Sequence, residues 1–159
     1  MSINKTVDRL DVWADTKKQC LEGGSKYDVP IYKSIKYEDI NVDMKRKYTN
    51  THIHVLDMDT VDCAIDLINK GYNPLLLNMS DIRTSGGAVE RGSVAQEENL
   101  FRRSNYFKTL LQELYPLNGT SVVYSPKVCF FKENEESHYK YSAEDVFVDC
   151  IAAPAIRNP

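Results

Sequence analysis

The chain of 159 residues carries a formal net charge of -3 and 42% hydrophobic residues, which is typical of one soluble globular domain spanning residues 1–159. This charge argues against a general nucleic-acid or anionic-membrane binder, whose surface is usually basic. No apolar run reaches the roughly 18 residues of a membrane span. No secretory segment follows Met1, so we expect an intracellular protein, cytoplasmic or nuclear.

Hydrophobic periodicity predicts an α/β fold. In chain order we expect a helix over 6–22, a polar surface excursion over 29–49, a strand over 52–57, a helix over 60–70, a strand over 74–78, a helix over 94–114, and strands over 121–124, 128–131 and 146–153. The unit of strand 52–57, helix 60–70 and strand 74–78 predicts a right-handed βαβ crossover.

The ends of two helices carry recognisable signals. Asp59 or Thr60 can cap the helix over 60–70, and Gly71 can end it. Ser93 and Gln96 have the spacing of a capping box, with Ser93 at the N-cap and Gln96 three positions later. We therefore expect the helix over 94–114 to begin just after Ser93.

The segment from Asn78 to Ser104 carries the most chemical information. A strand ends at Asn78, so the following residues lie at the carboxyl edge of the sheet, where α/β proteins bind ligands. Gly86 and Gly87 allow close backbone approach, and N–H groups of such a loop can hold an anionic or hydroxyl-rich ligand. A helix then opens with two carboxylates, at residues 97 and 98.

The two carboxylates cannot serve the same purpose. Adjacent helical residues project about 100° apart, so one of Glu97 and Glu98 can face a ligand hydroxyl while the other faces a scissile bond. A general acid must carry a proton, which requires burial or a nearby phosphate to raise its pKa. The plainer interpretation is that acidic residues in a first turn are solvated and complement the helix dipole, and that Gly-Gly is only a turn.

In its order of motifs this segment resembles the microbial poly(ADP-ribose) glycohydrolases. Their signature is a run of glycines, a short spacer, Gln-Glu-Glu and then Arg-Arg-Ser. The matching positions here are 86–88, Gly92, 96–98 and 102–104. Flanking segments are similar too, so the resemblance covers nearly the whole chain. It implies a macrodomain-like three-layer α/β fold, with a mixed β-sheet flanked by helices.

The resemblance also implies an activity, the hydrolysis of ribose–ribose O-glycosidic bonds in poly(ADP-ribose) with release of ADP-ribose, without a metal or a cofactor. Glu98 would act as general acid and then base, and Glu97 would bind ribose hydroxyls. The implied ligand contacts are Asn78, Gly86, Gly87, Ala88, Val89, Gln96 and, at the adenine amino group, Asp59. Implied partners are ADP-ribose, its polymer and ADP-ribosylated proteins. The alternatives are a non-catalytic ADP-ribose reader or inactive remnant, and a protein-interaction domain that has lost the ligand.

The chain departs from the family pattern in three places. Ala88 replaces the last glycine of the run, and Ser85 stands where proline is usual. The family's C-terminal part, with a second glycine-rich loop around the diphosphate, has no counterpart in this sequence. Because that loop would supply half of the phosphate cradle, we expect residues 1–159 alone to bind ADP-ribose weakly and to hydrolyse the polymer poorly.

Other polar groups have simpler interpretations. His52 and His54 lie two apart, as two metal ligands can, but no third ligand follows at a regular spacing, and exposed strand histidines are the expectation. Arg102 and Arg103 can grip phosphate or form helix-surface ion pairs with Glu98 or Glu113. The run over 132–136 predicts a solvated hairpin tip.

Overall fold

The computed structural model describes residues 7–28, 32–38 and 48–154. Its helices are α1 (Arg9–Leu21), α2 (Thr60–Asn69) and α3 (Gln96–Arg103), and its strands are β1 (Ile35–Tyr37), β2 (Leu75–Ser80), β3 (Val122–Lys132) and β4 (Tyr141–Pro154). Three short 3-10 turns lie at 89–91, 106–108 and 112–114. Within these described ranges, no helix combines the length and the apolar character that crossing a membrane requires.

The strands form one mixed sheet in the order β1-β3-β4-β2. The long strands β3 and β4 pair antiparallel, whereas β2 runs parallel to β4, with Asn78 opposite Ala152. β1 adds antiparallel to the outer edge of β3. This arrangement confirms the predicted α/β fold with a mixed sheet.

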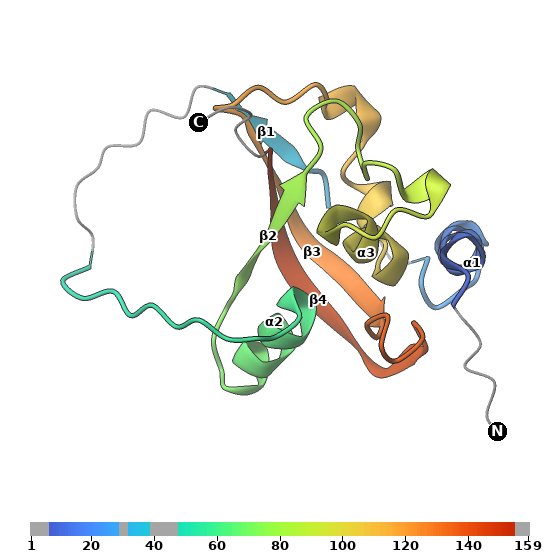
Figure 1. Ribbon diagram of the computed structural model, residues 1–159, viewed down its shortest axis with the longest axis horizontal. Helices are drawn as coiled ribbons and strands as arrows, with labels where there is room; N and C mark the ends of the chain where they lie inside the picture. The colour runs from blue at the N-terminus through green and yellow to red at the C-terminus, as the bar shows by residue number, and fades with distance from the viewer. Residues whose placement is uncertain (1–6, 29–31, 39–47, 155–159) are drawn as a thin grey trace.

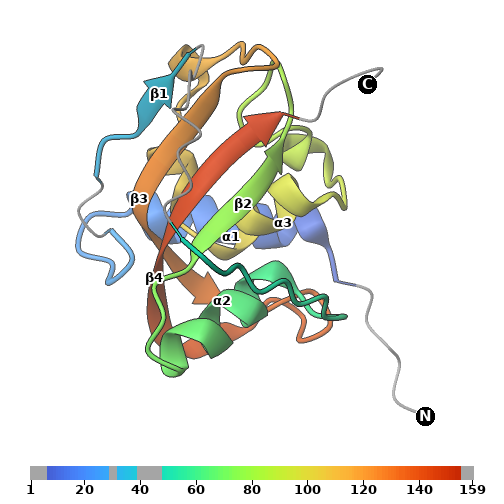
Figure 2. The ribbon, with the colours of Figure 1, turned by 90° about the vertical axis from the view of Figure 1, so that its left-hand side faces the viewer.

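The helices cover one face of the sheet and its lower end. In Figure 1 the sheet is seen close to edge-on, with α1 and α3 on one side. Figure 2, viewed from the other side, shows α2 at the lower end, where Val61 and Ala64 join the same buried cluster as Leu100. On β2, the side chains at alternate positions are buried and exposed, as expected for a strand whose two faces differ in cover.

The core lies between the sheet and the layer of α1 and α3. Its fully buried members include Val123, Val128, Phe130 and Val148 from the two long strands and Leu100, Phe101 and Tyr106 from α3 and the turn after it. α3 therefore packs directly against the sheet, and this packing places the start of the helix beside the end of β2.

The predicted helix over 94–114 is wrong beyond Arg103. Ser104 leaves the helix with an extended backbone and forms an isolated bridge with Phe130 of β3. Its hydroxyl donates to the carbonyl of Leu100. The apolar residues that follow are buried through short 3-10 turns, so their helical spacing reflects burial and not one continuous helix.

The predicted capping box is also wrong. The N-cap residue is Ala95, which makes no side-chain cap bond. By contrast, Asp59 caps α2 as predicted, because its carboxylate accepts from the amides of Val61 and Asp62.

The predicted strand over 52–57 is not a strand, so the βαβ unit is not formed within the described chain. Ile53 and Val55 are 85% and 93% exposed, and in Figure 1 this segment runs well away from the sheet before it enters α2. The alternating pattern is that of a strand, but among the described residues no neighbouring strand pairs with it.

Two smaller differences concern the sheet. The strands predicted over 121–124 and 128–131 are one strand, β3, interrupted by an irregularity between Ser125 and Val128. The short strand β1 lies within 29–49, where no strand is predicted. Its three residues are too few to produce a readable pattern. Residues 39–47 of that segment lie outside the described residues.

Candidate active site

The candidate site forms where β2 ends, the loop over 81–95 crosses, and α3 begins. Gly86 and Gly87 both have left-handed backbone angles, with φ of 74° and 56°. A Cβ on Gly86 would lie 2.5 Å from the ring of Phe101, and one on Gly87 would lie 2.6 Å from Oε1 of Glu98. Only glycine fits these two positions, so the loop can lie directly on the start of α3.

Glu97 is 2% exposed and its carboxylate is surrounded by hydrogen-bond donors. Oε2 accepts from the backbone amide of Asp81 at 2.7 Å. Oε1 accepts from Nδ2 of Asn78 at 3.2 Å and from the amide of Gly86 at 3.2 Å. The Tyr115 hydroxyl donates to the same oxygen at 3.4 Å.

Burial raises the pKa of the Glu97 carboxyl to about 7, and the neighbouring charge of Glu98 acts in the same direction. The hydrogen bonds from Asp81, Asn78 and Gly86 act to lower it, because each stabilises the ionised form. The balance leaves a buried carboxyl that titrates near neutral pH.

Glu98 lies beside Glu97 but is held differently. It is 5% exposed, and its Oε1 accepts from the amide of Ala88 at 2.9 Å. Ala88 has a φ of -110°, a negative value that alanine adopts without strain. The missing third glycine is therefore compatible with the loop backbone, and the amide of this residue contacts Glu98. Val89 follows as a buried residue.

Gln96 connects α3 to the free edge of β2. Its Nε2 donates to the carbonyl of Leu77 at 2.7 Å, and its Oε1 accepts from the amide of Met79 at 2.8 Å. One side-chain amide thus makes the pair of hydrogen bonds that a neighbouring strand would make. In this structure Gln96 fixes the start of the helix, while its predicted contact with a ligand stays a prediction.

A second glutamine, which the sequence does not single out, holds the other end of the loop. Nε2 of Gln112 donates to the carbonyl of Arg83 at 2.9 Å, and its Oε1 accepts from the amide of Ser85 at 3.0 Å. The hydroxyl of Ser85 donates to the carbonyl of Leu110. Ser85, where proline is usual, therefore uses both its N–H and its hydroxyl to anchor the loop.

The side chains of Asn78 and Asp59 are both hydrogen-bonded to neighbouring groups of the protein. The side chain of Asn78 is fully buried and reaches Glu97, so its contribution to a ribose site stays a prediction. Oδ1 of Asp59 caps α2 and also accepts from Nη1 of Arg103 at 2.7 Å. Although burial acts to raise the pKa of Asp59, the guanidinium beside it lowers that pKa overall.

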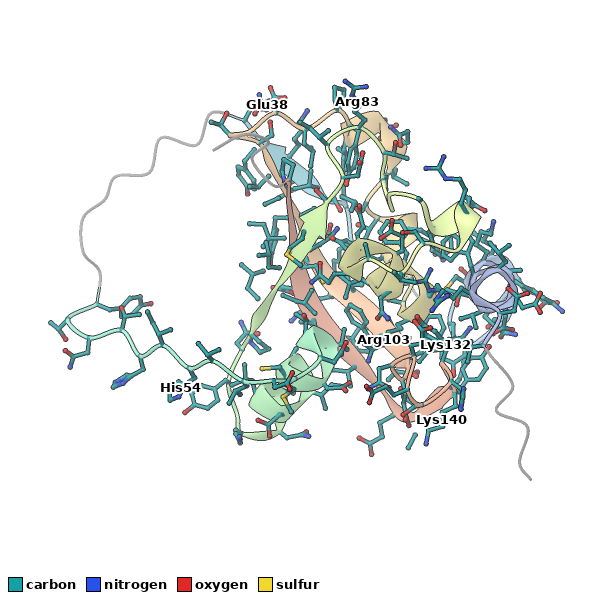
Figure 3. The ribbon with its side chains drawn as sticks, in the orientation of Figure 1. Glu38, His54, Arg83, Arg103, Lys132 and Lys140 are labelled. Atoms are coloured by element: carbon teal, nitrogen blue, oxygen red, sulfur yellow. The ribbon has the colours of Figure 1, made fainter. Side chains whose placement is uncertain are left out.

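The arginine pair is buried, not at the surface, and it does not pair with Glu98 or Glu113 in the bonds described. Arg103 is 1% exposed and also donates to Asp62 and to the carbonyl of Lys132. It joins α2, α3 and β3, as Figure 3 illustrates. Nε of Arg102 donates to the hydroxyl of Tyr139 at 3.2 Å. Periodicity within a helix could not have revealed these partners, which lie far away in the sequence.

The remaining polar segments have structural roles. Residues 133–140 form the turn between β3 and β4, which confirms the predicted hairpin. Lys132 is 3% exposed and pairs with Asp15, so the prediction of a solvated run is wrong at that residue. His52 and His54 are exposed, and Figure 3 places His54 on the segment leading to α2. Among the described residues, no three acidic, histidine or cysteine side chains are grouped closely enough to hold a metal ion.

Taken together, the mixed sheet, the glycine loop over the start of α3 and the two buried carboxylates define an α/β protein with a loop-covered acidic site. The family model for the catalytic domain of microbial-type poly(ADP-ribose) glycohydrolase matches residues 12–133. The chain belongs to this family. No curated protein matches the sequence.

Solved structures of two bacterial enzymes share the fold. Poly(ADP-ribose) glycohydrolase from Thermomonospora curvata superposes with a TM-score of 0.72 at 21% identity, over 92% of this chain and 64% of that one. The enzyme from Deinococcus radiodurans, in complex with ADP-ribose, gives a TM-score of 0.54 at 28% identity, over 64% and 43% of the two chains. The chain therefore spans less than two thirds of the length of these structures.

Proposed function

We propose that this chain contributes the acidic half of a site that hydrolyses ribose–ribose O-glycosidic bonds in poly(ADP-ribose) and releases ADP-ribose. Membership of the glycohydrolase family supports the reaction class. The similar Deinococcus radiodurans structure holds ADP-ribose, which supports this ligand class. The observation that carries the proposal is the pair of buried carboxylates beneath a glycine loop at the start of α3.

The hydrogen bonds support a division of roles between the two glutamates. All the groups that hydrogen-bond to the Glu97 carboxylate are donors, and these bonds favour the ionised form against the burial that favours the neutral one. An ionised carboxylate can accept hydrogen bonds from ribose hydroxyls. Glu98 accepts one bond, from Ala88, and its second oxygen can carry the proton that a general acid needs.

In this mechanism Glu98 donates its proton to the departing ribose oxygen as the bond from that oxygen to C1″ breaks. The resulting oxocarbenium-like C1″ is then attacked by water, which returns a proton to Glu98. Many glycosidases divide such work between two carboxylates on opposite faces of the sugar. Here the carboxylates are adjacent in sequence and share one loop, so one residue acts as acid and then as base while the other positions the sugar.

The proposal is tested by Glu98→Gln, measured both as ADP-ribose release from automodified substrate and as calorimetric binding of ADP-ribose. The change preserves shape and removes the titrating proton, so we expect hydrolysis to be lost while binding is nearly unchanged. Glu90→Gln is the matched control, because Glu90 is an exposed acidic residue in the same loop. Unchanged turnover in Glu98→Gln would exclude the mechanism.

The same pair of measurements decides the second candidate, a non-catalytic ADP-ribose reader. The specific observation in its favour is that Ala88 stands in place of the family's third glycine, where its methyl group can crowd a ligand held against the loop backbone. Because residues 1–159 alone are expected to hydrolyse poorly, the reader is established only if a chain extended by the family's C-terminal part also binds ADP-ribose and releases none from the polymer.

A further inference from the structure

Tyr115 approaches Glu97 from outside the segment that builds the rest of the site. It follows the 3-10 turn at 112–114 and is 8% exposed, within the main apolar core. Its hydroxyl donates to Oε1 of Glu97 at 3.4 Å. The other three donors, Asn78, Asp81 and Gly86, all come from the strand and loop that lead into α3.

This difference in origin has a mechanical consequence. The bonds from Asn78, Asp81 and Gly86 hold the carboxylate relative to β2 and the loop, which are continuous with α3 along the chain. A bond from Tyr115, whose ring is fixed in the core, holds the carboxylate relative to the body of the protein. Burial raises the pKa of Tyr115, and the charge of Glu97 adds to this, so the hydroxyl keeps its proton and remains a donor.

The charged and titratable surroundings of Glu97 are acidic throughout the part of the chain that the structure describes. Glu98 faces it from α3, Asp81 from the loop and Tyr115 from the turn region, while β2 contributes the neutral Asn78. Neutral donors therefore stabilise the Glu97 carboxylate without a cation beside it. Each such donor matters more than it would beside an arginine, because a buried charge loses its water.

We propose that Tyr115 is a positioning residue, which holds the Glu97 carboxylate in the orientation that receives the ribose hydroxyls. The role rests on the proposed glycohydrolase function, because it acts through Glu97 on a bound sugar. Tyr115 itself does not touch the reacting atoms. Removing the hydroxyl leaves Oε1 of Glu97 with two donors instead of three, which loosens the orientation of the carboxylate and displaces the sugar from Glu98.

The first test is Tyr115→Phe, which keeps the buried ring and removes only the hydroxyl. We expect about a tenfold loss in kcat/KM, the size expected for one hydrogen bond to a charged group. Tyr139→Phe is the matched control, because Tyr139 is 3% exposed and its hydroxyl bonds to the side chains of Arg102 and Glu135, not to Glu97. It should retain full activity.

A double-mutant cycle with Glu97→Gln separates positioning from a general structural effect. If Tyr115 acts through Glu97, Tyr115→Phe should have no further effect on turnover once Glu97 is replaced. The same tenfold loss in the Glu97→Gln background would overturn the proposal. So would an equal loss in Tyr139→Phe, which would show that loss of any buried tyrosine hydroxyl has this effect.

A titration that needs no substrate distinguishes failure of this inference from failure of the proposed function. The hydroxyl stabilises the ionised carboxylate, so Tyr115→Phe should raise the pKa of Glu97 above its value of about 7. Carbon-13 NMR of labelled glutamate carboxyls would measure this shift. If the shift appears but the wild type, extended by the family's C-terminal part, hydrolyses nothing, the contact stands and the glycohydrolase function fails. An unchanged titration overturns the role of Tyr115.

Discussion

At the scale of single residues, Gly87 carries the steric constraint that acts directly on the two carboxylates. A Cβ at this position would lie 2.6 Å from Oε1 of Glu98 and 3.3 Å from Oε2 of Glu97. Its φ of 56° adds a conformational cost for any residue with a side chain. The absence of one methyl group therefore lets the loop amides reach both carboxylates.

We predict that Gly87→Ala destabilises the protein by at least about 1–2 kcal/mol, the cost of a left-handed backbone for alanine, and abolishes activity because Glu98 must move. Thermal melting and ADP-ribose release would measure the two effects. The control is Gly119→Ala, since a Cβ there meets nothing within 4 Å, and its cost should stay within about 0.5 kcal/mol. Equal melting temperatures for the two variants would contradict the steric argument.

At the scale of elements, the start of α3 is held by side-chain hydrogen bonds to a neighbouring strand and not by an N-cap. The helix has no side-chain N-cap bond, yet it must hold Glu97 and Glu98 in fixed positions. The side chain of Gln96 supplies the restraint by bonding to Leu77 and Met79 on β2. The residue predicted to belong to a capping box thus acts between elements rather than within one helix.

Replacing Gln96 by Glu gives a prediction with a definite sign. An acidic residue at the first position of a helix normally stabilises it by about 0.3–1 kcal/mol. Here the carboxylate would face the carbonyl of Leu77 and lose one of two hydrogen bonds, so we expect Gln96→Glu to destabilise by about 1–2 kcal/mol. Urea unfolding would measure the change, and a stabilised variant would show that the bond to β2 contributes little.

At the scale of the whole molecule, the sheet is covered unevenly. α1 and α3 lie on one face, and α2 lies at the lower end of the sheet, where its buried residues join the same core (Figure 2). On the open face the apolar side chains of Leu75, Leu77, Met79 and Phe147 are about half exposed. β2 is also the last strand on its side of the described sheet. Apolar edge strands of this kind favour association between molecules.

We predict that residues 1–159, as an isolated chain, self-associate with increasing concentration. A charge on the exposed face should oppose this, so Leu77→Lys should lower the sedimentation coefficient measured at high concentration. The control is Tyr72→Lys, which removes an exposed aromatic residue in the turn between α2 and β2. A wild-type chain that remains monomeric at several hundred micromolar would contradict the prediction.

The sequence by itself determined features that depend on local geometry. Gly86 and Gly87 indicate a tight loop because only glycine adopts such angles freely. Asp59 indicates the start of α2 because a cap needs only the next few amides. The order of glycines, Gln-Glu-Glu and Arg-Arg-Ser indicates the family, which the match to residues 12–133 shows. Each of these signals is complete within a short stretch of chain.

Only the tertiary structure decided what surrounds those residues. Arg103 pairs with Asp59 and Asp62, 44 and 41 positions away, and α3 ends early because Ser104 bridges to Phe130. Likewise, no pattern in the sequence links Tyr115 to Glu97. The burial that brings the pKa of Glu97 to about 7 comes from β2, the loop and the core together. Burial and long-range partners are properties of packed elements, and a local pattern cannot contain them.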